Sequence, residues 1–281
     1  MTLTFAKKTG TAVVLGPGGP VGTAWLAGLA AGLRREGVDL GAADLIVGTS
    51  AGAIVGAILA VGGDLERLAV LPAPTDPGAG GVRPDPRRLA EVFATLGDTG
   101  LDRTEALRRV GRLALAASTG DEGAAVARMR SLIGAAEWPD RPLLIPAVDA
   151  GTGEAVVWDR HGSASLPEAV AAGTAFPATA PPITIDGRRY LDGALRDGTN
   201  LDLADGASVL IVAEPMAHLY GTSDGAAGER GVVVRLVPDA EAIEAFGPDL
   251  NDRAAWGPAY QAGVGQAPDA AKAVRAHSAI A

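Results

Sequence analysis

Short apolar runs alternate with glycine-rich turns and with helical spacing of apolar residues at the start of the chain. Residues 11–16 form a β-branched run that leads into a Gly/Pro loop over 16–22, and residues 23–33 then place large apolar side chains at helical spacing. A second run over 44–48 leads directly into an all-apolar helical stretch over 51–61. This order of elements predicts parallel strands joined by helical crossovers.

The rest of the chain continues the mixture of helix and strand. The segment 72–88 is rich in Pro and Gly and predicts a loop. The Asp186–Gly187 pair predicts the tight turn of a hairpin. The other predicted elements are a helical stretch over 86–136, strands over 142–150 and 154–159, hairpin strands within 181–195, strands over 208–215 and 231–238, and a helix from 254 to the end.

Composition narrows the class of protein. The 281 residues are 48% hydrophobic with 39 glycines, which is typical of a compact α/β protein, and we expect one domain over 1–281. The formal net charge of −9 argues against nucleic-acid binding and against electrostatic docking on anionic membranes. Because the chain has no cysteine, disulfides, thiolate metal sites and cysteine nucleophiles are excluded.

Targeting signals are not visible in the sequence. The N-terminal segment lacks the apolar stretch of a signal peptide, and the longest apolar run, 51–63, is shorter than the ~20 residues that span a bilayer. We therefore expect a cytoplasmic protein that contacts membranes at most transiently.

The sequence GTSAG over 48–52 places a serine at a strand-to-helix turn. This is the pattern of a nucleophile elbow, in which Gly48 and Gly52 supply the residues without bulk that a sharp turn requires. The positive end of the following helix dipole would favour negative charge developing near Ser50. The alternative is that Ser50 only caps the helix, and the motif by itself does not decide between the two.

The loop GPGGPVG over 16–22 also joins a strand to a helix. Because proline has no N–H, Pro17 and Pro20 leave Gly18 and Gly19 as the candidate pair of amide donors for an oxyanion. A dinucleotide-binding loop is the competing interpretation. It is disfavoured because Val21 stands where that fingerprint has its third glycine.

A nucleophilic serine requires a base. The chain has three histidines, and Ser50, Asp192 and either His218 or His277 could formally make the triad of an α/β-hydrolase, whereas His161 lies in a predicted surface turn. That fold places several strands before its elbow, but only about two precede Ser50. Asp192 is followed by Gly193, and Asp-Gly pairs usually only form turns, which argues against a catalytic role for Asp192.

Asp192 differs from the aspartate at the hairpin tip in its place along the chain. Asp186 is committed to the turn, whereas Asp192 follows the returning strand and can project into a site. A carboxylate is therefore the candidate base.

Three blocks, LGPGGPVGTAWLAGLAAGL (15–33), GTSAGAIVGA (48–57) and AAGTAFPATAPPITIDGRRYLDGAL (171–195), carry a family resemblance. In order and spacing they resemble the patatin-like phospholipases, lipid acyl hydrolases that use a Ser–Asp dyad. The resemblance covers about residues 12–204.

The resemblance implies a three-layer α/β/α fold with a mostly parallel central sheet. It implies that Ser50 is the nucleophile, Asp192 the base, and Gly18 and Gly19 the oxyanion loop. It also implies that the partner is a lipid or another acyl ester and that the reaction requires no metal and no organic cofactor. The helical and loop segment 64–136 is a candidate cap over the site, and the oligomeric state is left open.

One departure from the family pattern bears on the substrate. Members commonly carry Gly-Gly-Gly-x-Arg-Gly in the first block, whereas this chain has Pro17 at the first glycine and Val21 at the arginine. A guanidinium that could meet a substrate phosphate is therefore missing there. Two alternatives stay open: an acyltransferase or thioesterase that uses the same serine, and a non-catalytic lipid-binding protein.

Overall fold

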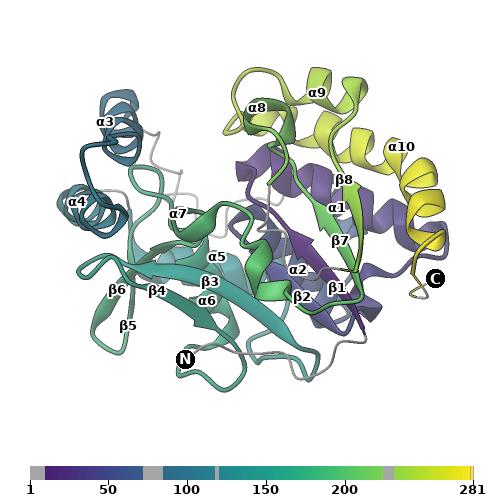
Figure 1. Ribbon diagram of the computed structural model, residues 1–281, viewed down its shortest axis with the longest axis horizontal. Coiled ribbons are helices and arrows are strands. Elements are labelled where there is room, and N and C mark those ends of the chain that lie inside the picture. The colour runs from purple at the N-terminus through teal and green to yellow at the C-terminus, as the bar shows by residue number, and fades with distance from the viewer. Residues whose placement is uncertain (1–9, 72–84, 118–119, 224–230, 279, 281) are drawn as a thin grey trace.

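The computed structural model describes residues 10–71, 85–117, 120–223, 231–278 and 280. Its centre is one sheet with the strand order β5-β6-β3-β2-β1-β7-β8, to which β4 is added beside β3 (Figure 1). The strands are β1 (Thr11–Leu15), β2 (Leu45–Gly48), β3 (Leu143–Asp149), β4 (Ala155–Trp158), β5 (Ile183–Ile185), β6 (Arg188–Asp192), β7 (Val209–Ala213) and β8 (Val232–Leu236).

The middle of the sheet is parallel and buried on both faces. β1 pairs with β2 and β7, β2 pairs with β3, and β7 pairs with β8, all in parallel. Alternate residues of β1 belong to different apolar clusters, since Val13 and Leu15 face one side while Ala12 and Val14 face the other. Burial on both faces explains why these strands read as continuous apolar runs in the sequence.

One edge of the sheet is antiparallel. β6 pairs with β3 and β5, and β4 pairs with β3, in antiparallel register. The predicted hairpin is confirmed, because Asp186 and Gly187 join β5 to β6 with φ values of 50° and 75°. Two successive positive φ angles are what a tight hairpin turn requires.

Helices cover both faces of the sheet. The larger layer contains α1 (Gly19–Arg35), α2 (Ala51–Ala60), α5 (Glu122–Ile133), α6 (Leu166–Gly173) and α10 (Trp256–Arg275), whose buried side chains share one cluster with the sheet. On the other face, α3 (Pro86–Leu96) and α4 (Arg103–Ala116) pack over the antiparallel edge, and the turn Leu201–Ala204 covers the parallel strands (Figure 1). The predicted α/β class with a mostly parallel sheet between helical layers is confirmed.

The remaining helical elements are short. They are α7 (Ala194–Asp197), α8 (Ala217–Tyr220), α9 (Ala240–Phe246) and the 3-10 turns η1 (Leu40–Ala42), η2 (Glu66–Ala69), η3 (Leu201–Ala204) and η4 (Arg253–Ala255). None of the helices in the described ranges has the length and apolar character needed to cross a bilayer.

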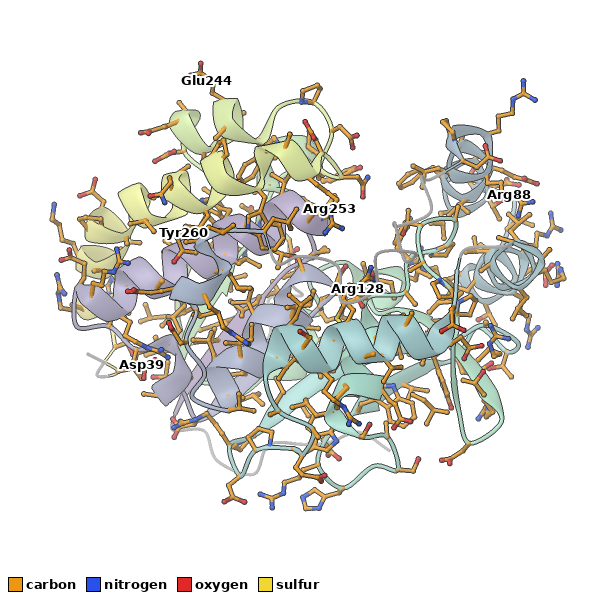
Figure 2. All side chains as sticks on the ribbon, turned by 180° about the vertical axis from the view of Figure 1, so that it is seen from behind. Asp39, Arg88, Arg128, Glu244, Arg253 and Tyr260 are labelled. Carbon is orange, nitrogen blue, oxygen red and sulfur yellow. The ribbon has the colours of Figure 1, made fainter. Side chains whose placement is uncertain are left out.

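α1 and α10 lie side by side at close range. Tyr260 of α10 lies on the side that faces α1 and is 1% exposed (Figure 2). A Cβ atom at Gly28 would lie only 2.0 Å from Tyr260 O, and one at Gly263 would lie 2.3 Å from Trp25 O. The contact between the two helices is therefore made through backbone atoms and requires glycine at both positions.

Several predicted boundaries need correction. The first helix begins at Gly19, not at residue 23, because Pro20 has the φ angle that suits a first turn. The stretch 86–136 is not continuous. It is three helices, each capped by an aspartate side chain that accepts a hydrogen bond from an amide of its first turn, namely Asp85, Asp102 and Asp121. Residues 72–84 of the predicted loop lie outside the described residues.

Candidate active site

Ser50 occupies a strained turn between β2 and α2. Its φ of 54° and ψ of −115° lie in a region that non-glycine residues rarely adopt. Although it stands at the N-cap of α2, its side chain makes no capping hydrogen bond. The Ser50 hydroxyl therefore does not cap α2, which was the alternative that the sequence left open.

The two elbow glycines are required by close backbone contacts. A Cβ atom at Gly52 would lie 2.0 Å from Leu15 O, and one at Gly48 would lie 2.5 Å from Gly52 O. Such distances are far below van der Waals contact, so any side chain would displace the turn. Gly52 N also donates a hydrogen bond to Gly16 O at 3.2 Å, which ties the elbow to the start of the glycine-rich loop.

Gly18 and Gly19 lie in that loop, at the N-terminus of α1. Gly19 has a φ of 60°, and a Cβ atom on Gly18 would lie 2.8 Å from both Gly22 Cα and Pro215 Cβ. Within the described part of the chain, neither Gly18 N nor Gly19 N donates a hydrogen bond. Two amides without acceptors at a helix N-terminus can bind an anionic oxygen.

Asp192 is the last residue of β6 and is fully buried, with 0% of its surface exposed. Its backbone is fixed by a hydrogen bond from Asp192 N to Ala175 O at 3.1 Å. Oδ1 accepts a hydrogen bond from Ala194 N at 2.8 Å, while Oδ2 has no hydrogen-bond partner among the described residues. The free oxygen is available to a hydroxyl group.

Burial raises the pKa of Asp192 to about 7. A hydrogen bond from the Ala194 amide, and then the nearby Ser50 hydroxyl, lowers that pKa and partly offsets the effect of burial. The Ser50 hydroxyl thus lies close enough to Asp192 to act on its carboxyl, although the two side chains do not have the geometry of a hydrogen bond. Catalytic hydrogen bonds are often long before substrate binds.

None of the three histidines makes a hydrogen bond with Ser50 or Asp192 among the described residues. His161 and His277 are exposed, and the ring of His218 packs edge-on against Phe246 with their centroids 5.6 Å apart. None of the three acts on the pKa of Asp192. The structure therefore offers no histidine for a triad with Ser50.

The other candidate aspartates are on the surface. Asp186 is exposed at the hairpin tip, where its carboxylate accepts a hydrogen bond from the Ser163 hydroxyl. Asp197 is also exposed, at the end of α7. Of these Asp-Gly aspartates, only Asp192 is buried beside the serine.

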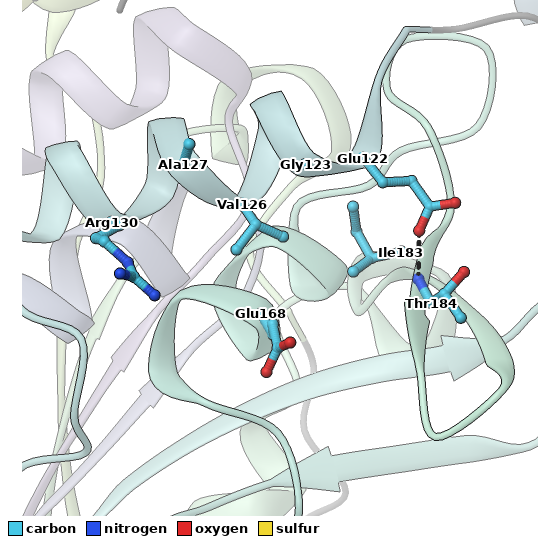
Figure 3. Close-up of a pocket in the computed structure, with 8 residues that line it drawn as sticks. All are labelled: Glu122, Gly123, Val126, Ala127, Arg130, Glu168, Ile183 and Thr184. Atoms are coloured by element: carbon cyan, nitrogen blue, oxygen red, sulfur yellow. Dashed lines mark hydrogen bonds between the residues drawn. The ribbon is translucent and has the colours of Figure 1, made fainter.

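A cavity among the described residues lies elsewhere. It has a volume of about 460 Å³ between α5, α6 and β5, and Glu122 at its rim accepts a hydrogen bond from Thr184 N at 2.8 Å (Figure 3). Neither Ser50 nor Asp192 lines it. Within the described residues, no group of three or more His, Asp or Glu side chains has the arrangement of a metal site.

Two buried polar residues near the pair were not singled out by any sequence pattern. Thr49 and Asn200 are each 0% exposed, and Asn200 Nδ2 donates a hydrogen bond to Thr49 Oγ1 at 3.0 Å. A clue was present for Thr49, which is adjacent to the elbow serine. Asn200 contacts Thr49 across 151 positions of the chain, so local patterns in the sequence do not reveal it.

Comparisons with known proteins bear on the family. The sequence model described as "Patatin-like phospholipase" matches residues 13–205. No curated protein matches the sequence significantly. Among solved structures, the chain is similar to VipD from Legionella pneumophila, with 13% sequence identity and a TM-score of 0.43, over 95% of this chain and 67% of VipD.

Proposed function

The chain belongs to the patatin-like phospholipase family and is a lipid acyl hydrolase, and from this membership we propose that Ser50 and Asp192 form its catalytic dyad. The observation that carries the proposal is the juxtaposition of the two side chains. They come from separate blocks of the sequence and from β2 and β6, which are not neighbours in the sheet. A strained, uncapped serine beside a buried carboxylate with a free oxygen is an arrangement suited to nucleophilic catalysis.

The proposed reaction has two steps. Asp192 Oδ2 accepts the hydroxyl proton as Ser50 Oγ attacks the ester carbonyl, and the proton then passes to the departing alcohol, which leaves an acyl group on Ser50. Water attacks the acyl-enzyme, again giving its proton to Asp192, and the fatty acid is released as Ser50 recovers its proton. The serine and the aspartate are thus regenerated.

The amides of Gly18 and Gly19 are the proposed oxyanion donors. Both lack acceptors within the described residues and lie next to the elbow through the bond from Gly52 N to Gly16 O. One such donor typically contributes about 10²- to 10³-fold in rate, because it is aimed in advance at the charge that develops on the carbonyl oxygen.

The raised pKa of Asp192 suits its proposed role. A base works best when its pKa lies near the working pH, and an ordinary aspartate, with a pKa of about 3.9, would be too weak. Burial raises the pKa of Asp192 to about 7, so the carboxylate is more basic yet still substantially ionised at neutral pH.

Helices α3 and α4 support the proposal that part of the segment 64–136 caps the site. Val92 and Leu107 share an apolar cluster with Leu191 and Leu195, which flank the Asp192–Gly193 turn. Arg103 Nη2 also donates a hydrogen bond to Leu195 O at 2.5 Å. These two helices are therefore well placed to shape the environment of an acyl chain.

The test is an ester panel with matched variants. Wild type should hydrolyse p-nitrophenyl acyl esters and lipid esters, whereas Ser50→Ala should fall to background and Asp192→Asn should lose about 10²- to 10⁴-fold. The controls are Ser131→Ala and Asp186→Asn, which alter exposed residues. The dyad proposal is wrong if wild type is active and Ser50→Ala is equally active.

Product analysis identifies the acceptor. Free fatty acid as the main product supports a hydrolase, whereas an acyl ester formed only when an alcohol or thiol is added would indicate a transferase. Hydrolysis rates on a panel of phospholipids, lysophospholipids, monoacylglycerols and short esters test whether a chain with Val21 in place of the family arginine still accepts a phosphate head group.

A further inference from the structure

Asn200 is a buried amide in the loop that follows Asp192. It is 0% exposed and stands at the N-cap of η3, with a φ of 59° and a ψ of 42°. This left-handed conformation is rare for residues other than glycine and is best tolerated by asparagine and aspartate. Burying a side-chain amide costs free energy unless the amide forms hydrogen bonds. The hydrogen-bond partners of Asn200 therefore indicate its structural role.

The partners of Asn200 are next to both members of the proposed dyad. Asn200 Nδ2 donates to Thr49 Oγ1 at 3.0 Å and to Gly193 O at 3.1 Å. Thr49 immediately precedes Ser50, and Gly193 immediately follows Asp192. A single side-chain amide therefore connects the nucleophile turn to the turn of the base.

The orientation of the amide is fixed from its other end. Arg196 Nη1 donates to Asn200 Oδ1 at 2.8 Å, and Arg196 is held in turn by Asp202 at 2.7 Å and 2.5 Å. Because a guanidinium can only donate, it selects the oxygen of the Asn200 amide. The NH₂ group must then face Thr49, Gly193 and also Gly198 O, which it meets at 3.1 Å.

The dyad has few other means of fixing its geometry. β3 lies between β2 and β6 in the sheet, so no strand pairing joins the two turns directly. Within the described ranges, Asp192 also lacks a third residue that would orient it, since Ala194 N is the one group there that donates to its carboxylate. The separation of Ser50 Oγ and Asp192 Oδ2 therefore depends on how the two turns are held together.

We propose that Asn200 is a positioning residue, which sets the distance between Ser50 and Asp192 by cross-linking Thr49 to Gly193. The proposal rests on the function proposed above. Asn200 does not touch the reacting atoms and acts only through the two turns. A misplacement of about 1 Å at a reacting centre can cost about 10²-fold in rate, so one lost cross-link is sufficient to matter.

The test uses Asn200→Gly, which removes the side chain and keeps the left-handed backbone accessible. We expect kcat on a soluble ester to fall about 10²-fold with KM within about threefold of wild type, because the variant affects alignment and not substrate binding. Asn200→Asp should behave similarly, since a carboxylate cannot donate to Gly193 O.

A matched control separates positioning from stability. Trp138→Phe removes a different hydrogen bond, from Trp138 Nε1 to Ala164 O at 2.8 Å, well outside the Thr49–Asn200 contact. It should lower the unfolding midpoint without changing kcat. The positioning role is overturned if Trp138→Phe lowers the unfolding midpoint as much as Asn200→Gly does and also lowers kcat by the same factor.

A second route to the same contact covers the case in which Asn200→Gly does not fold. Thr49→Val removes the hydroxyl that accepts from Asn200 while keeping the shape of the side chain, and it should likewise lower kcat more than it changes KM. Where both single variants fold, kcat of the double variant should fall by less than the product of the two single losses, because both substitutions remove the same Thr49–Asn200 hydrogen bond.

The outcomes distinguish this inference from the function on which it rests. The positioning role is wrong if Asn200→Gly or Thr49→Val is folded and keeps kcat within about threefold of wild type while Ser50→Ala is inactive. The proposed function itself fails if Ser50→Ala retains the activity of wild type, whatever the effect of Asn200→Gly.

Discussion

At the scale of single residues, the site combines strain, burial and unpaired polar atoms. Ser50 is held at a positive φ, and Asp192 is buried with one carboxylate oxygen that has no hydrogen-bond partner in the described part of the chain. Both features cost stability and persist because the surrounding backbone contacts fix them. These costs in stability are concentrated at the two residues proposed to react. Departures from ordinary backbone and burial preferences are expected at functional sites.

The raised pKa of Asp192 predicts that stability depends on pH. Its folded-state pKa of about 7 lies above the ~3.9 of an unfolded aspartate, so the folded protein retains a proton that the unfolded chain releases. The stabilising contribution is therefore complete below about pH 4 and is lost as the pH rises through about 7. Asp192→Asn should remove this loss. Relative to wild type, its free energy of unfolding should rise by about 1.4 kcal/mol for each pH unit between the unfolded and folded pKa values.

Urea unfolding at several pH values between 4 and 8 provides the measurement. Asp186→Asn, which changes an exposed aspartate, is the control and should follow wild type. A wild type and an Asp192→Asn variant with the same pH dependence would contradict the raised pKa.

The same pKa predicts the direction of the pH–rate profile. Since only the ionised carboxylate can accept the serine proton, kcat/KM should rise with pH through about 7 and then level off. Steady-state rates with a neutral soluble ester between pH 5 and 9 measure this. A rate that falls across that interval would be inconsistent with Asp192 as the base.

At the scale of elements, the contact between α1 and α10 holds the first helix, and with it the glycine-rich loop, in place. Gly28→Ala would bring a methyl group within 2.0 Å of Tyr260 O, so the helices must separate. We expect the free energy of unfolding of this variant to fall by about 1–3 kcal/mol, the usual cost of overpacking a core.

Gly265→Ala is the matched control for Gly28→Ala. Gly265 also lies within a helix, α10, but a Cβ atom there would meet nothing within 4 Å. This variant should gain roughly 0.5–1 kcal/mol, because alanine favours helix over glycine. Equal unfolding free energies for Gly28→Ala and wild type would show that the helices are not in backbone contact.

At the scale of the whole molecule, a half-buried charge on α5 has no partner among the described residues. Arg128 of α5 makes no ion pair or hydrogen bond with any described residue, and burial and then the nearby charge of Arg253 lower its pKa (Figure 2). Arg128→Met should therefore raise the unfolding midpoint, whereas Arg130→Met, at an exposed position of the same helix, should leave it nearly unchanged. Calorimetry that finds Arg128→Met less stable than Arg130→Met would disprove this.

The parts of the molecule that were predictable from sequence are those specified locally. Strands 11–16 and 44–48 and the Asp186–Gly187 turn follow from apolar runs and turn residues within a few positions of each other. The breaks near Asp102 and Asp121 were missed because the apolar spacing continues across them, although both aspartates are N-caps.

The site was predictable only in part. Ser50 and Asp192 stand within recognisable motifs, and the structure brings them together. The role of Asn200 depends on contacts with Thr49 and Gly193, which are distant from each other in the chain, and on a left-handed backbone that no single-sequence pattern marks. Long-range hydrogen bonding of this kind is visible only once the fold is known.

Labelling with a fluorophosphonate probe, mapped by mass spectrometry, tests the central claim most directly, because the probe reacts only with an activated serine. The account predicts one modified residue, Ser50, and a labelling rate that falls at least about 10²-fold in Asp192→Asn while Asp186→Asn labels like wild type. Modification of a different serine, or an unchanged labelling rate in Asp192→Asn, would contradict a Ser50–Asp192 dyad.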